Sequence, residues 1–426
     1  MMRFAISGCL GSQGCETVTQ HANRMLGWHG SDRAFCSPVK AIDFDQKRRI
    51  MNFRARSMEK MVLDGAEGLA EDGNEVKTYP TRRLSSQEAV DAWSSMSRQN
   101  VDPESYVEEM VSFYSSELGG IVNDPGMMGV AVNESLVHSG HGVYEKFRVI
   151  DGYVYQMNAR MDRLMLSAAK ANIQLPKKWS KAQLQRIILE TIAAGKMLQG
   201  HVTVFLSIGR GSYGNPVVLP SKAAMYVIVS KLDESLAESD EYLRGWQVKT
   251  SPVPCKSPYF ATLKSTDRFQ DTMAIMDAKA EGYQTGIFID DQGYVAGAPD
   301  ANVVFLMEDH ELVFPPVTHA VPTLSMLRLM EVSSFALADG DLNVSKISQR
   351  RISLEEAKSS KEAMLVGSQF PVMPIVKWDE HVIGEGDVGI VSLQLRVLLQ
   401  ADVEYTEKSP NHTEVPYGYL TGMDAE

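Results

Sequence analysis

The stretch YFATLKSTDRFQDTMAIMDAKAEG, residues 259–282, joins an extended apolar run to an amphipathic helix, with one lysine at the junction. The run predicts a strand that ends at Lys264, and Met273, Met276 and Ala280 share one stripe of the following helix. A lysine at the inner end of a strand loses part of its solvation. This loss lowers its pKa and makes the neutral amine a nucleophile toward carbonyl groups. The pattern alone also fits a solvated lysine at a strand end, because lysine is rarely buried.

The composition is that of an ordinary globular protein. Of the 426 residues, 44% are apolar and 23% are charged. This length predicts about two to three domains. The 42 basic and 54 acidic side chains give a net charge of −12, which argues against nucleic acid or an anionic membrane as partner. No apolar run approaches the roughly 18 residues that a membrane-spanning helix needs. We therefore expect binding to neither nucleic acid nor membrane.

The cysteines and the N-terminus bear on the compartment. Cys9, Cys15, Cys36 and Cys255 include no CxxC pair, and this pattern favours free thiols in a reducing compartment. The N-terminal stretch MMRFAISGCLGSQGCETVTQ lacks the apolar core of a secretory signal, but it is poor in acids and has scattered basic residues. We expect a protein of the cytoplasm, or of a plastid or other organelle, and not a secreted one.

Local signals for helix starts and turns divide the chain into elements. Ser85 and Glu88 form a Ser-x-x-Glu capping box, and Asp102 predicts the start of a second helix through DPESYVEEMVSFYSS. The pair Asp151-Gly152 predicts a hairpin turn between VYEKFRV and YVYQM. Further helix starts are predicted at Ser180, Thr323 and Ser353, and strands are predicted through HVTVFLSIGRG, AAMYVIVS, GIFI, NVVFL, MLVGS and PVMPIVKW.

These elements predict an α+β chain with two domains and an N-terminal extension. The acidic, polar stretch KLDESLAESDEYLRG, which begins at Lys231, is typical of a linker between domains. The expected boundaries are a poorly ordered extension at 1–80, a helical lead-in at 81–118, a small α+β domain at 119–235, a larger domain with Lys264 at 246–403, and a polar, frayed tail at 404–426.

Several motifs, in order and in register, resemble one known family. VHSGHGVYEKFRVIDGYVYQMNARMDRLMLSAAKANI, followed by LKSTDRF, GIFIDDQGYVAGAPDANVVFL, VPTLSMLRLMEV and LVGSQFPVMPIVKW, resembles the class IV aminotransferases of fold type IV. The resemblance runs from FYSSELGGIVNDPG to about Leu399 and is strongest to the plant and algal group of D-amino-acid transaminases and aminodeoxychorismate lyases. It implies a two-domain α+β enzyme, pyridoxal 5'-phosphate as cofactor, and a homodimer.

The motifs of this family imply the residues of a cofactor site. By resemblance, Lys264 forms the Schiff base with the cofactor and carries the proton between the substrate Cα and the cofactor. Arg163, in RMDRL, falls on the arginine that binds the cofactor phosphate, and Ser368 matches a second phosphate-binding hydroxyl. Leu324 and Ser325 fall on the family's phosphate turn at the start of a predicted helix, where free N–H groups suit a phosphate.

The residues that would contact substrate have alternatives. Tyr144 matches an aromatic residue that contacts substrate in some family members, and ordinary strand packing is the alternative. Arg210, in the glycine-rich loop after LSIG, would bind a substrate carboxylate, and a solvated loop arginine is the alternative. His138 and His141 lack a third ligand at suitable spacing, so we predict no metal site.

The sequence departs from the family pattern around the expected site. The family's glutamate that pairs with the pyridine nitrogen lies five residues before Asn302, where this chain has Gly297. Without this acid the cofactor ring is a weaker electron sink. The histidine or equivalent that opens the arginine motif is Arg160, and the asparagine–aromatic pair after the lysine is Asp267-Arg268. Other departures are Ser139, Thr203 and Thr323.

The expected function follows from the retained and the departing residues. We expect a pyridoxal-phosphate-dependent aminotransferase or lyase that acts through Lys264 on an amino acid and a keto acid, or on an aminodeoxychorismate-like substrate. The alternative is a homologue that binds the cofactor but is catalytically impaired, because Gly297 replaces the acid. Restoring the acid with Gly297→Glu is expected to separate the two.

Overall fold

The computed structural model describes residues 82–98, 109–212, 222–231, 240–318, 320–368, 370–404 and 409–418. The chain divides into two units, Met1–Asn74 and Glu75–Glu426, and every described residue lies in the second unit. The extension expected at 1–80 therefore lies outside the described residues. Within those residues, no helix is both long enough and apolar enough to cross a membrane.

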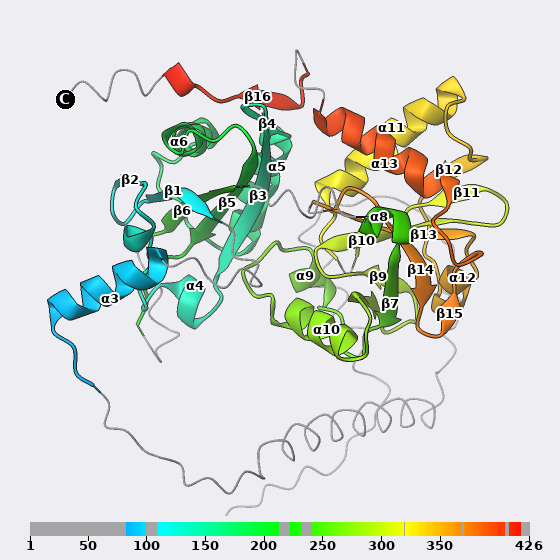
Figure 1. Cartoon of the computed structure of the whole chain (residues 1–426), viewed down its shortest axis with the longest axis horizontal. Coiled ribbons are helices and arrows are strands. Elements are labelled where there is room, and N and C mark those ends of the chain that lie inside the picture. The colour runs from blue at the N-terminus through cyan, green and yellow to red at the C-terminus, as the bar shows by residue number, and fades with distance from the viewer. Residues whose placement is uncertain are drawn as a thin grey trace, which may run out of the picture. The chain divides into compact units, whose positions relative to one another are not determined.

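The first sheet is antiparallel, in the order β16-β4-β3-β5-β6-β1-β2 (Figure 1). The turn between β3 and β4 contains Asp151 and Gly152, both with positive φ, 48° and 80°. A type I′ hairpin needs positive φ at both positions, so the predicted hairpin is confirmed. The strands are β1 (Met110–Ser115), β2 (Gly120–Val122), β3 (Gly142–Ile150), β4 (Tyr153–Tyr155), β5 (Gly200–Ser207), β6 (Ala224–Lys231) and β16 (His412–Glu414).

Helices α5 (Met157–Lys170) and α6 (Lys181–Ala194) cover the first sheet and close one hydrophobic core (Figure 1). Met161, Leu164 and Ile188 are fully buried there. The Ser180 hydroxyl oxygen caps α6 by accepting a hydrogen bond from the N–H of Gln183 at 3.2 Å, as its sequence position predicts. The shorter elements on this side are α3 (Ser86–Arg98), η1 (Pro125–Met127) and α4 (Ser135–His138).

The second sheet is mixed, in the order β12-β11-β10-β13-β14-β7-β8-β9, with β15 paired to β14. Strands β7, β8 and β14 run parallel to one another, whereas β10 and β13 are antiparallel. The strands are β7 (Trp246–Thr250), β8 (Thr285–Ile289), β9 (Val295–Gly297), β10 (Ala301–Leu306), β11 (Glu311–Val313), β12 (Lys346–Ser348), β13 (Glu362–Gly367), β14 (Met373–Trp378) and β15 (His381–Val382).

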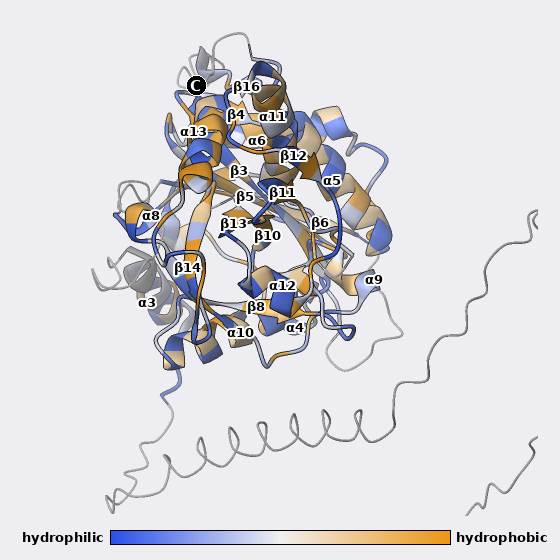
Figure 2. Cartoon of the chain, turned by 90° about the vertical axis from the view of Figure 1, so that its right-hand side faces the viewer, coloured by the Kyte–Doolittle hydropathy of each residue, from blue (hydrophilic) through white to orange (hydrophobic). Residues whose placement is uncertain are grey.

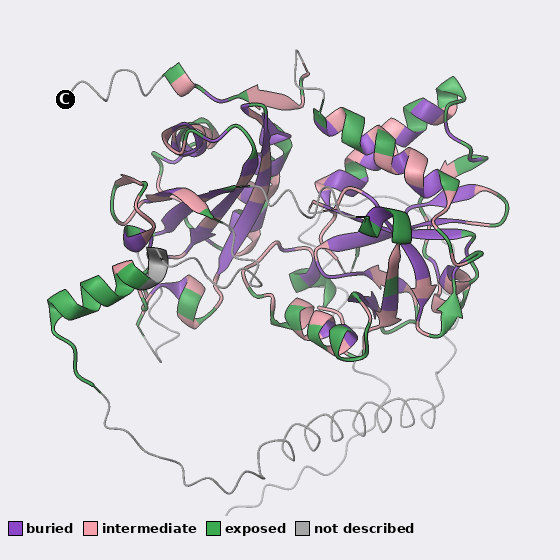
Figure 3. Ribbon diagram, in the orientation of Figure 1, coloured by how far each residue is buried: buried purple, intermediate pink, exposed green. Residues whose placement is uncertain are grey.

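Helices cover the second sheet as well. Figure 1 shows α11 (Leu324–Asp339) beside α13 (Ile390–Glu404), and the two pack over one core with strands β10 and β13. Helix α10 (Phe269–Ala280) packs on β8. The strands are mostly buried in Figure 3, and the hydropathy colouring of Figure 2 shows apolar residues along them. The remaining helices are α8 (Glu241–Arg244), α9 (Pro258–Ala261) and α12 (Leu354–Lys358).

Three sequence-based expectations about elements are wrong. The helix expected through DPESYVEEMVSFYSS does not reach its end, because Met110–Ser115 forms β1 between β2 and β6. The strand expected before Lys264 is instead the short helix α9, which has Pro258 at its first position. The tail expected to be frayed supplies β16, which pairs with β4. The capping box at Ser85 and Glu88 is confirmed by reciprocal hydrogen bonds of 2.8 and 3.3 Å.

Candidate active site

Lys264 lies in a loop that is fixed to the end of strand β3. The N–H of Tyr144 donates to the carbonyl oxygen of Lys264 at 3.0 Å, and the N–H of Thr266 donates to the carbonyl oxygen of Gly142 at 2.9 Å. These bonds join the loop of the second sheet to the first sheet. The Lys264 ammonium nitrogen lies 4.7 Å from the centre of the Tyr144 ring. The lysine is therefore held against an aromatic face and is not a solvated strand-end residue.

The surroundings of Lys264 favour its neutral form. Burial lowers the pKa of the Lys264 amine from 10.5 to about 8. The nearby positive charges of Arg163 and Arg160 act in the same direction, whereas Glu145 and Asp300 oppose it. A pKa of about 8 leaves a useful fraction of free amine at neutral pH, which a nucleophilic or basic lysine requires.

Glu145, the next residue on β3, is fully buried and paired with two arginines of α5. Arg163 donates to both of its carboxylate oxygens, from Nε and Nη2, each at 2.7 Å. Arg160 Nη1 lies 3.5 Å from Glu145 Oε1 and donates to the carbonyl oxygen of Lys146 at 2.8 Å. Burial alone raises the pKa of Glu145, but the charge and hydrogen bonds of Arg163 outweigh it and keep the pKa below its ordinary value. The carboxylate is therefore ionised.

Arg163 also reaches the turn before α11. Its Nη1 donates to the carbonyl oxygen of Pro322 at 2.7 Å. The next residue, Thr323, is the N-cap of α11, and its hydroxyl oxygen accepts from the N–H of Met326 at 3.1 Å. Leu324 and Ser325 follow as the first helical residues, where an N–H group has no acceptor within the helix. No described residue accepts a hydrogen bond from these two N–H groups. The start of α11 therefore offers donors beside an arginine whose side chain is 11% exposed.

Asn302 holds this turn in place. Its side-chain oxygen accepts from the N–H of Thr323 at 2.8 Å, and its side-chain nitrogen donates to the carbonyl oxygen of Val321 at 3.3 Å. Asn302 pairs with Val366 across β10 and β13, and Ser368 follows directly after β13. The sheet register thus brings Ser368, from a distant part of the sequence, to the same edge as the start of α11.

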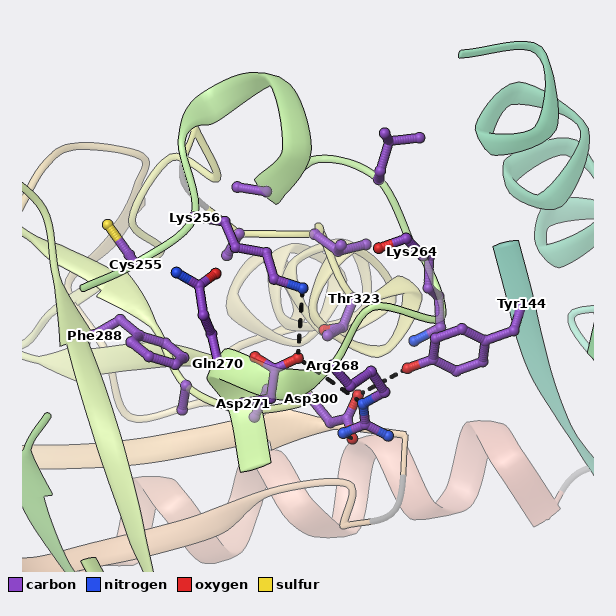
Figure 4. A pocket seen from close by; sticks show the side chains of 17 residues that line it. Tyr144, Cys255, Lys256, Lys264, Arg268, Gln270, Asp271, Phe288, Asp300 and Thr323 are labelled. Carbon is purple, nitrogen blue, oxygen red and sulfur yellow. Dashed lines mark hydrogen bonds and ion pairs between the residues drawn. The ribbon is translucent and has the colours of Figure 1, made fainter. Parts of the chain in front are cut away.

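A pocket opens between Lys264, the start of α11 and helix α10 (Figure 4). Tyr144 and Thr323 line it together with Lys264. In Figure 4 the Tyr144 hydroxyl points at Asp300, to which it donates at 3.2 Å, and Arg268 forms an ion pair with the same carboxylate. The other polar side chains of the lining are Lys256, Ser265, Gln270 and Asp271. Burial raises the pKa of the Asp271 carboxyl and of the Tyr144 hydroxyl.

Gly297, where the family has its pyridine-pairing glutamate, lies at the end of β9 behind this pocket. Its φ of +144° falls in a region that favours glycine. A Cβ added at this position would lie 3.1 Å from the Cβ of Ala320, which lines the pocket. The carboxylates that line the pocket, Asp271 and Asp300, come instead from α10 and from the turn after β9.

The structure does not bring every expected residue to the pocket. Arg210 is half exposed, and its Nε lies 2.9 Å from a carboxylate oxygen of Glu117. It is not part of the pocket lining, so its role as a substrate-binding residue stays a prediction. His141 Nε2 lies 2.8 Å from the carbonyl oxygen of Ala171. Among the described residues, no group of three potential metal-ligating side chains is found.

Several polar residues of the pocket were not predicted as site residues. Arg268 appeared in the sequence only as a departure from the family, and Asp271 and Lys256 carried no motif. Asp271 lies on the stripe of α10 that includes the buried Ala274 and Ala278, so the helical spacing was the one available signal. Lys256 follows no periodic pattern.

The site suits a phosphorylated aldehyde cofactor at two points. The largely enclosed side chain of Arg163 and the unbonded N–H groups at the start of α11 suit a phosphate dianion. A lysine with a lowered pKa suits an aldehyde. The site lacks one feature that the family pattern implies: position 297 is a glycine, so it supplies no carboxylate for the cofactor's pyridine nitrogen.

Comparison with known proteins shows which family this chain resembles. The family model described as amino-transferase class IV matches residues 142–378. The chain is 31% identical over 300 residues to the chloroplastic D-amino-acid transaminase of Arabidopsis thaliana, covering 70% of this chain and 77% of that protein. It is 23% identical over 257 residues to a putative branched-chain-amino-acid aminotransferase of Methanocaldococcus jannaschii, covering 60% of this chain and 85% of that protein.

Solved structures show the same fold. The branched-chain amino acid aminotransferase of Thermobaculum terrenum, in its form with pyridoxal phosphate, superposes with a TM-score of 0.62 at 16% identity, over 72% of this chain and 99% of that one. The Escherichia coli branched-chain amino acid aminotransferase gives 0.60 at 18% identity, over 73% and 100%. The resemblance drawn from the motifs and the expected α+β fold of fold type IV are therefore confirmed. The expected cofactor is confirmed at the level of the family.

Proposed function

Because the chain belongs to the class IV aminotransferase family, we propose that it is a pyridoxal-phosphate-dependent aminotransferase in which Lys264 holds the cofactor. The observation that carries the proposal is the position of Lys264. Its amine has a pKa of about 8 and lines a pocket with Thr323, the N-cap of α11. A nucleophilic amine and a phosphate-binding helix start in one pocket are what this cofactor needs.

We assign two groups of residues to the two ends of the cofactor: Lys264 and Tyr144 line the pocket, whereas the phosphate-end residues are not part of its lining. Arg163, the N–H groups of Leu324 and Ser325, and the hydroxyls of Ser325 and Ser368 would bind the phosphate. Lys264 would hold the aldehyde carbon and, once released, accept the proton from the substrate Cα. Tyr144 packs against the lysine and orients it. The cofactor itself supplies the electron sink that stabilises negative charge on Cα.

The lining of the pocket supports a polar substrate over a branched apolar one. A specificity pocket for valine or leucine side chains is built from apolar groups. Here Lys256, Arg268, Gln270, Asp271 and Asp300 line the pocket beside Lys264. We propose amino acids with polar or charged side chains as substrates, with the D-enantiomers tested first because of the relative from Arabidopsis thaliana.

The proposal is tested by turnover with a panel of amino acids. Wild-type protein loaded with pyridoxal 5'-phosphate is mixed with 2-oxoglutarate or pyruvate and with the D- or L-form of alanine, aspartate, glutamate, leucine or valine. We expect keto-acid-dependent turnover that is faster with polar side chains. Lys264→Ala should abolish it, whereas Lys249→Ala, at a lysine paired with Asp277 and Glu281 outside the pocket, should retain it. Equal activity of Lys264→Ala and wild type would exclude the proposed role.

Gly297 favours a second candidate function. A chain without the acid for the pyridine nitrogen would bind the cofactor but transaminate slowly or not at all, or would use lyase chemistry on an aminodeoxychorismate-like substrate. This candidate predicts a labelled Lys264 without keto-acid-dependent turnover. Release of pyruvate from 4-amino-4-deoxychorismate, without any keto acid added, would identify the lyase.

The assembly and the compartment are further parts of the proposal. We propose a homodimer, as the family resemblance implies, and light scattering of the purified chain measures its mass. We propose a plastid as the first compartment to test, since the relative from Arabidopsis thaliana is chloroplastic, with the cytoplasm as the other candidate. Microscopy of the full chain with a fluorescent C-terminal fusion distinguishes them.

A further inference from the structure

Arg160 is a buried arginine whose position in the family motif belongs to a histidine or its equivalent. Its side chain is only 4% exposed. Nη1 donates to the carbonyl oxygen of Lys146, but the N–H of Nε is buried and has no hydrogen-bond partner among the described residues. A buried guanidinium with an unused donor is energetically expensive, and it needs a reason beyond packing.

The charges around Arg160 do not cancel. Arg160 and Arg163 share one carboxylate, that of Glu145, and Arg163 takes both of its oxygens. The other groups close enough to influence Arg160 include Tyr155, which is neutral. Tyr155 donates to Asp402, but that carboxylate is held by Arg328, so it does not neutralise Arg160. The buried cluster of Glu145, Arg160 and Arg163 therefore has one excess positive charge.

This excess charge lies beside the start of α11. Arg163 is the link, because it donates to Glu145 and also to the carbonyl oxygen of Pro322, next to the N-cap Thr323. The same cluster influences Lys264, since both arginines lower the pKa of its amine. Positive charge, free helix N–H groups and a low effective dielectric together create a site for a compact anion of high charge.

We propose that Arg160 is a positioning residue for the phosphate of the cofactor: it neutralises Glu145 so that the charge of Arg163 remains available to the phosphate. With a neutral side chain at 160, Glu145 would cancel Arg163, and the helix start alone would attract the anion. This inference rests on the proposed function, since it assumes that the pocket takes the phosphorylated cofactor.

The test compares two ligands that differ only in the phosphate. Pyridoxal 5'-phosphate and pyridoxal are titrated separately into wild type, Arg160→Gln and Arg160→Lys, and binding is followed by the absorption of the lysine-bound ligand. We expect Arg160→Gln to weaken binding of pyridoxal 5'-phosphate by about tenfold to a hundredfold, through the loss of one charge near a dianion. Binding of pyridoxal should hardly change, and Arg160→Lys should restore most of the difference.

Arg148→Gln is the matched control. Arg148 lies on β3, two residues from Lys146, and its Nε is also buried without a partner among the described residues, but no contact found there links it to Glu145 or to the start of α11. Its loss should leave the ratio of the two dissociation constants unchanged. Thermal melting shows whether each variant is folded. An equal loss of affinity for both ligands in Arg160→Gln, or no loss for either, overturns the inference. Failure of the wild type to bind pyridoxal 5'-phosphate would refute the proposed function instead.

Discussion

Lys264 owes its chemistry to the residues around it. Its backbone is bonded to Tyr144 on another sheet, and its amine lies against the Tyr144 ring. Burial and the two arginines of α5 both disfavour the charged amine, and the carboxylates of Glu145 and Asp300 do not compensate for them. The lysine is therefore prepared for a carbonyl ligand before any ligand binds.

The lowered pKa predicts how the reactivity of Lys264 depends on pH. Because only the neutral amine reacts, the rate of its reaction with pyridoxal 5'-phosphate should rise with pH and level off above a pKa of about 8. At pH 7, about a tenth of the amine is neutral, roughly a few hundredfold more than for an ordinary lysine. Stopped-flow absorption between pH 6 and 10 measures this profile. A midpoint near the ordinary value of 10.5 would contradict the assigned environment.

Gly297 predicts a cost in stability for any side chain. Its φ of +144° and the 3.1 Å approach of an added Cβ to Ala320 strain even alanine. We expect Gly297→Ala to lower the free energy of unfolding by about 1–3 kcal/mol, measured by urea denaturation. Gly120→Ala is the control, because an added Cβ there has no atom within 4 Å, and its effect should be small. A neutral Gly297→Ala would show that the strain is absent.

The positive φ of Gly297 also changes how a result with the Gly297→Glu variant is interpreted. The sequence suggested that this substitution would restore the missing acid and separate an active enzyme from an impaired one. In the structure the glutamate would have to adopt a backbone conformation that side chains disfavour, beside Ala320. A lack of gain from Gly297→Glu would therefore not show that the scaffold is inactive.

At the residue scale, the family resemblance points to Lys264, Arg163 and Ser325, whose roles stay predictions, but it does not give the contacts among their neighbours. The pair of Arg268 and Asp300 joins positions 32 residues apart, and Tyr144 reaches Asp300 across 156 residues. No periodicity or spacing in one sequence encodes such tertiary contacts. Arg160 was noted as a departure, but its excess charge depends on Glu145 being shared, which only the folded structure shows.

Helix α11 is the element on which the proposed phosphate site depends. Thr323 caps it, its hydroxyl donates to the carbonyl oxygen of Val366 at 3.3 Å, and Asn302 holds its N–H. These three bonds fix the backbone at the start of the helix, next to the pocket that Thr323 lines. A change at this cap should therefore affect both stability and binding.

The prediction for α11 is a double effect of Thr323→Ala. Loss of an N-cap hydroxyl should lower the free energy of unfolding by about 1 kcal/mol, and disorder at the helix start should weaken pyridoxal 5'-phosphate binding several-fold. Ser353→Ala is the control, because Ser353 caps α12 in the same way, by accepting from the N–H of Glu356 at 3.2 Å. Ser353→Ala should lower the free energy of unfolding by as much as Thr323→Ala but should leave the affinity for the cofactor unchanged. Denaturation and absorption titration measure the two effects, and unchanged affinity in Thr323→Ala would contradict the assignment of the phosphate site.

Elements with local signals were predicted well, and elements set by their surroundings were not. The caps at Ser85, Ser180 and Ser353 and the Asp151-Gly152 turn are encoded in a few adjacent residues, and all are present in the structure. Strand β1 follows a strong helix-start signal, but pairing with both β2 and β6 overrides it. Strand β16 has little apolar character, and it forms because β4 offers an open edge.

At the scale of the whole molecule, one carboxylate links the first sheet to the two helices that cover the second sheet. Tyr155, on β4 of the first sheet, donates to Asp402 of α13 at 2.6 Å, and Arg328 of α11 donates to the same group from Nε at 2.9 Å. Burial alone raises the pKa of Asp402, but the hydrogen bonds from Arg328 and Tyr155 lower it below its ordinary value. Helix α11, whose first residues belong to the proposed phosphate site, is thus linked through Arg328, about one turn farther along, to strand β4 of the first sheet.

Tyr155→Phe should weaken this link. Loss of one hydrogen bond to a charged group should lower the free energy of unfolding by about 1.5–3 kcal/mol. The variant should also lose less stability on acidification than the wild type, because a carboxylate with a depressed pKa contributes stability that is lost as pH falls from its unfolded pKa through its folded pKa. Without the tyrosine hydroxyl the folded pKa of Asp402 rises toward its unfolded value, so this pH-dependent part of the stability becomes smaller. Tyr153→Phe, on the same strand, is the control. Identical acid transitions in Tyr155→Phe and wild type would contradict the assigned role of Asp402.

The sequence could predict part of the two-sheet organisation. The expected division into a small domain at 119–235 and a larger one at 246–403 stays a prediction. Strands β2 to β6 lie within the first range and β7 to β15 within the second, but β1 belongs to the first sheet and precedes residue 119. What a sequence pattern could not supply is the return of the chain to the first sheet through β16, since that pairing joins residues far apart.

The central claim, that Lys264 holds the cofactor of a working aminotransferase, is tested most directly by borohydride reduction with and without an amino acid. The protein is loaded with pyridoxal 5'-phosphate, incubated with or without a D-amino acid that the turnover panel selects, reduced, digested and mapped by mass spectrometry. We predict a phosphopyridoxyl label on Lys264 in the sample reduced without an amino acid. After the amino acid is added, the label should be lost and one equivalent of keto acid should be formed. A label that is absent from Lys264, or one that no amino acid removes, would contradict the account.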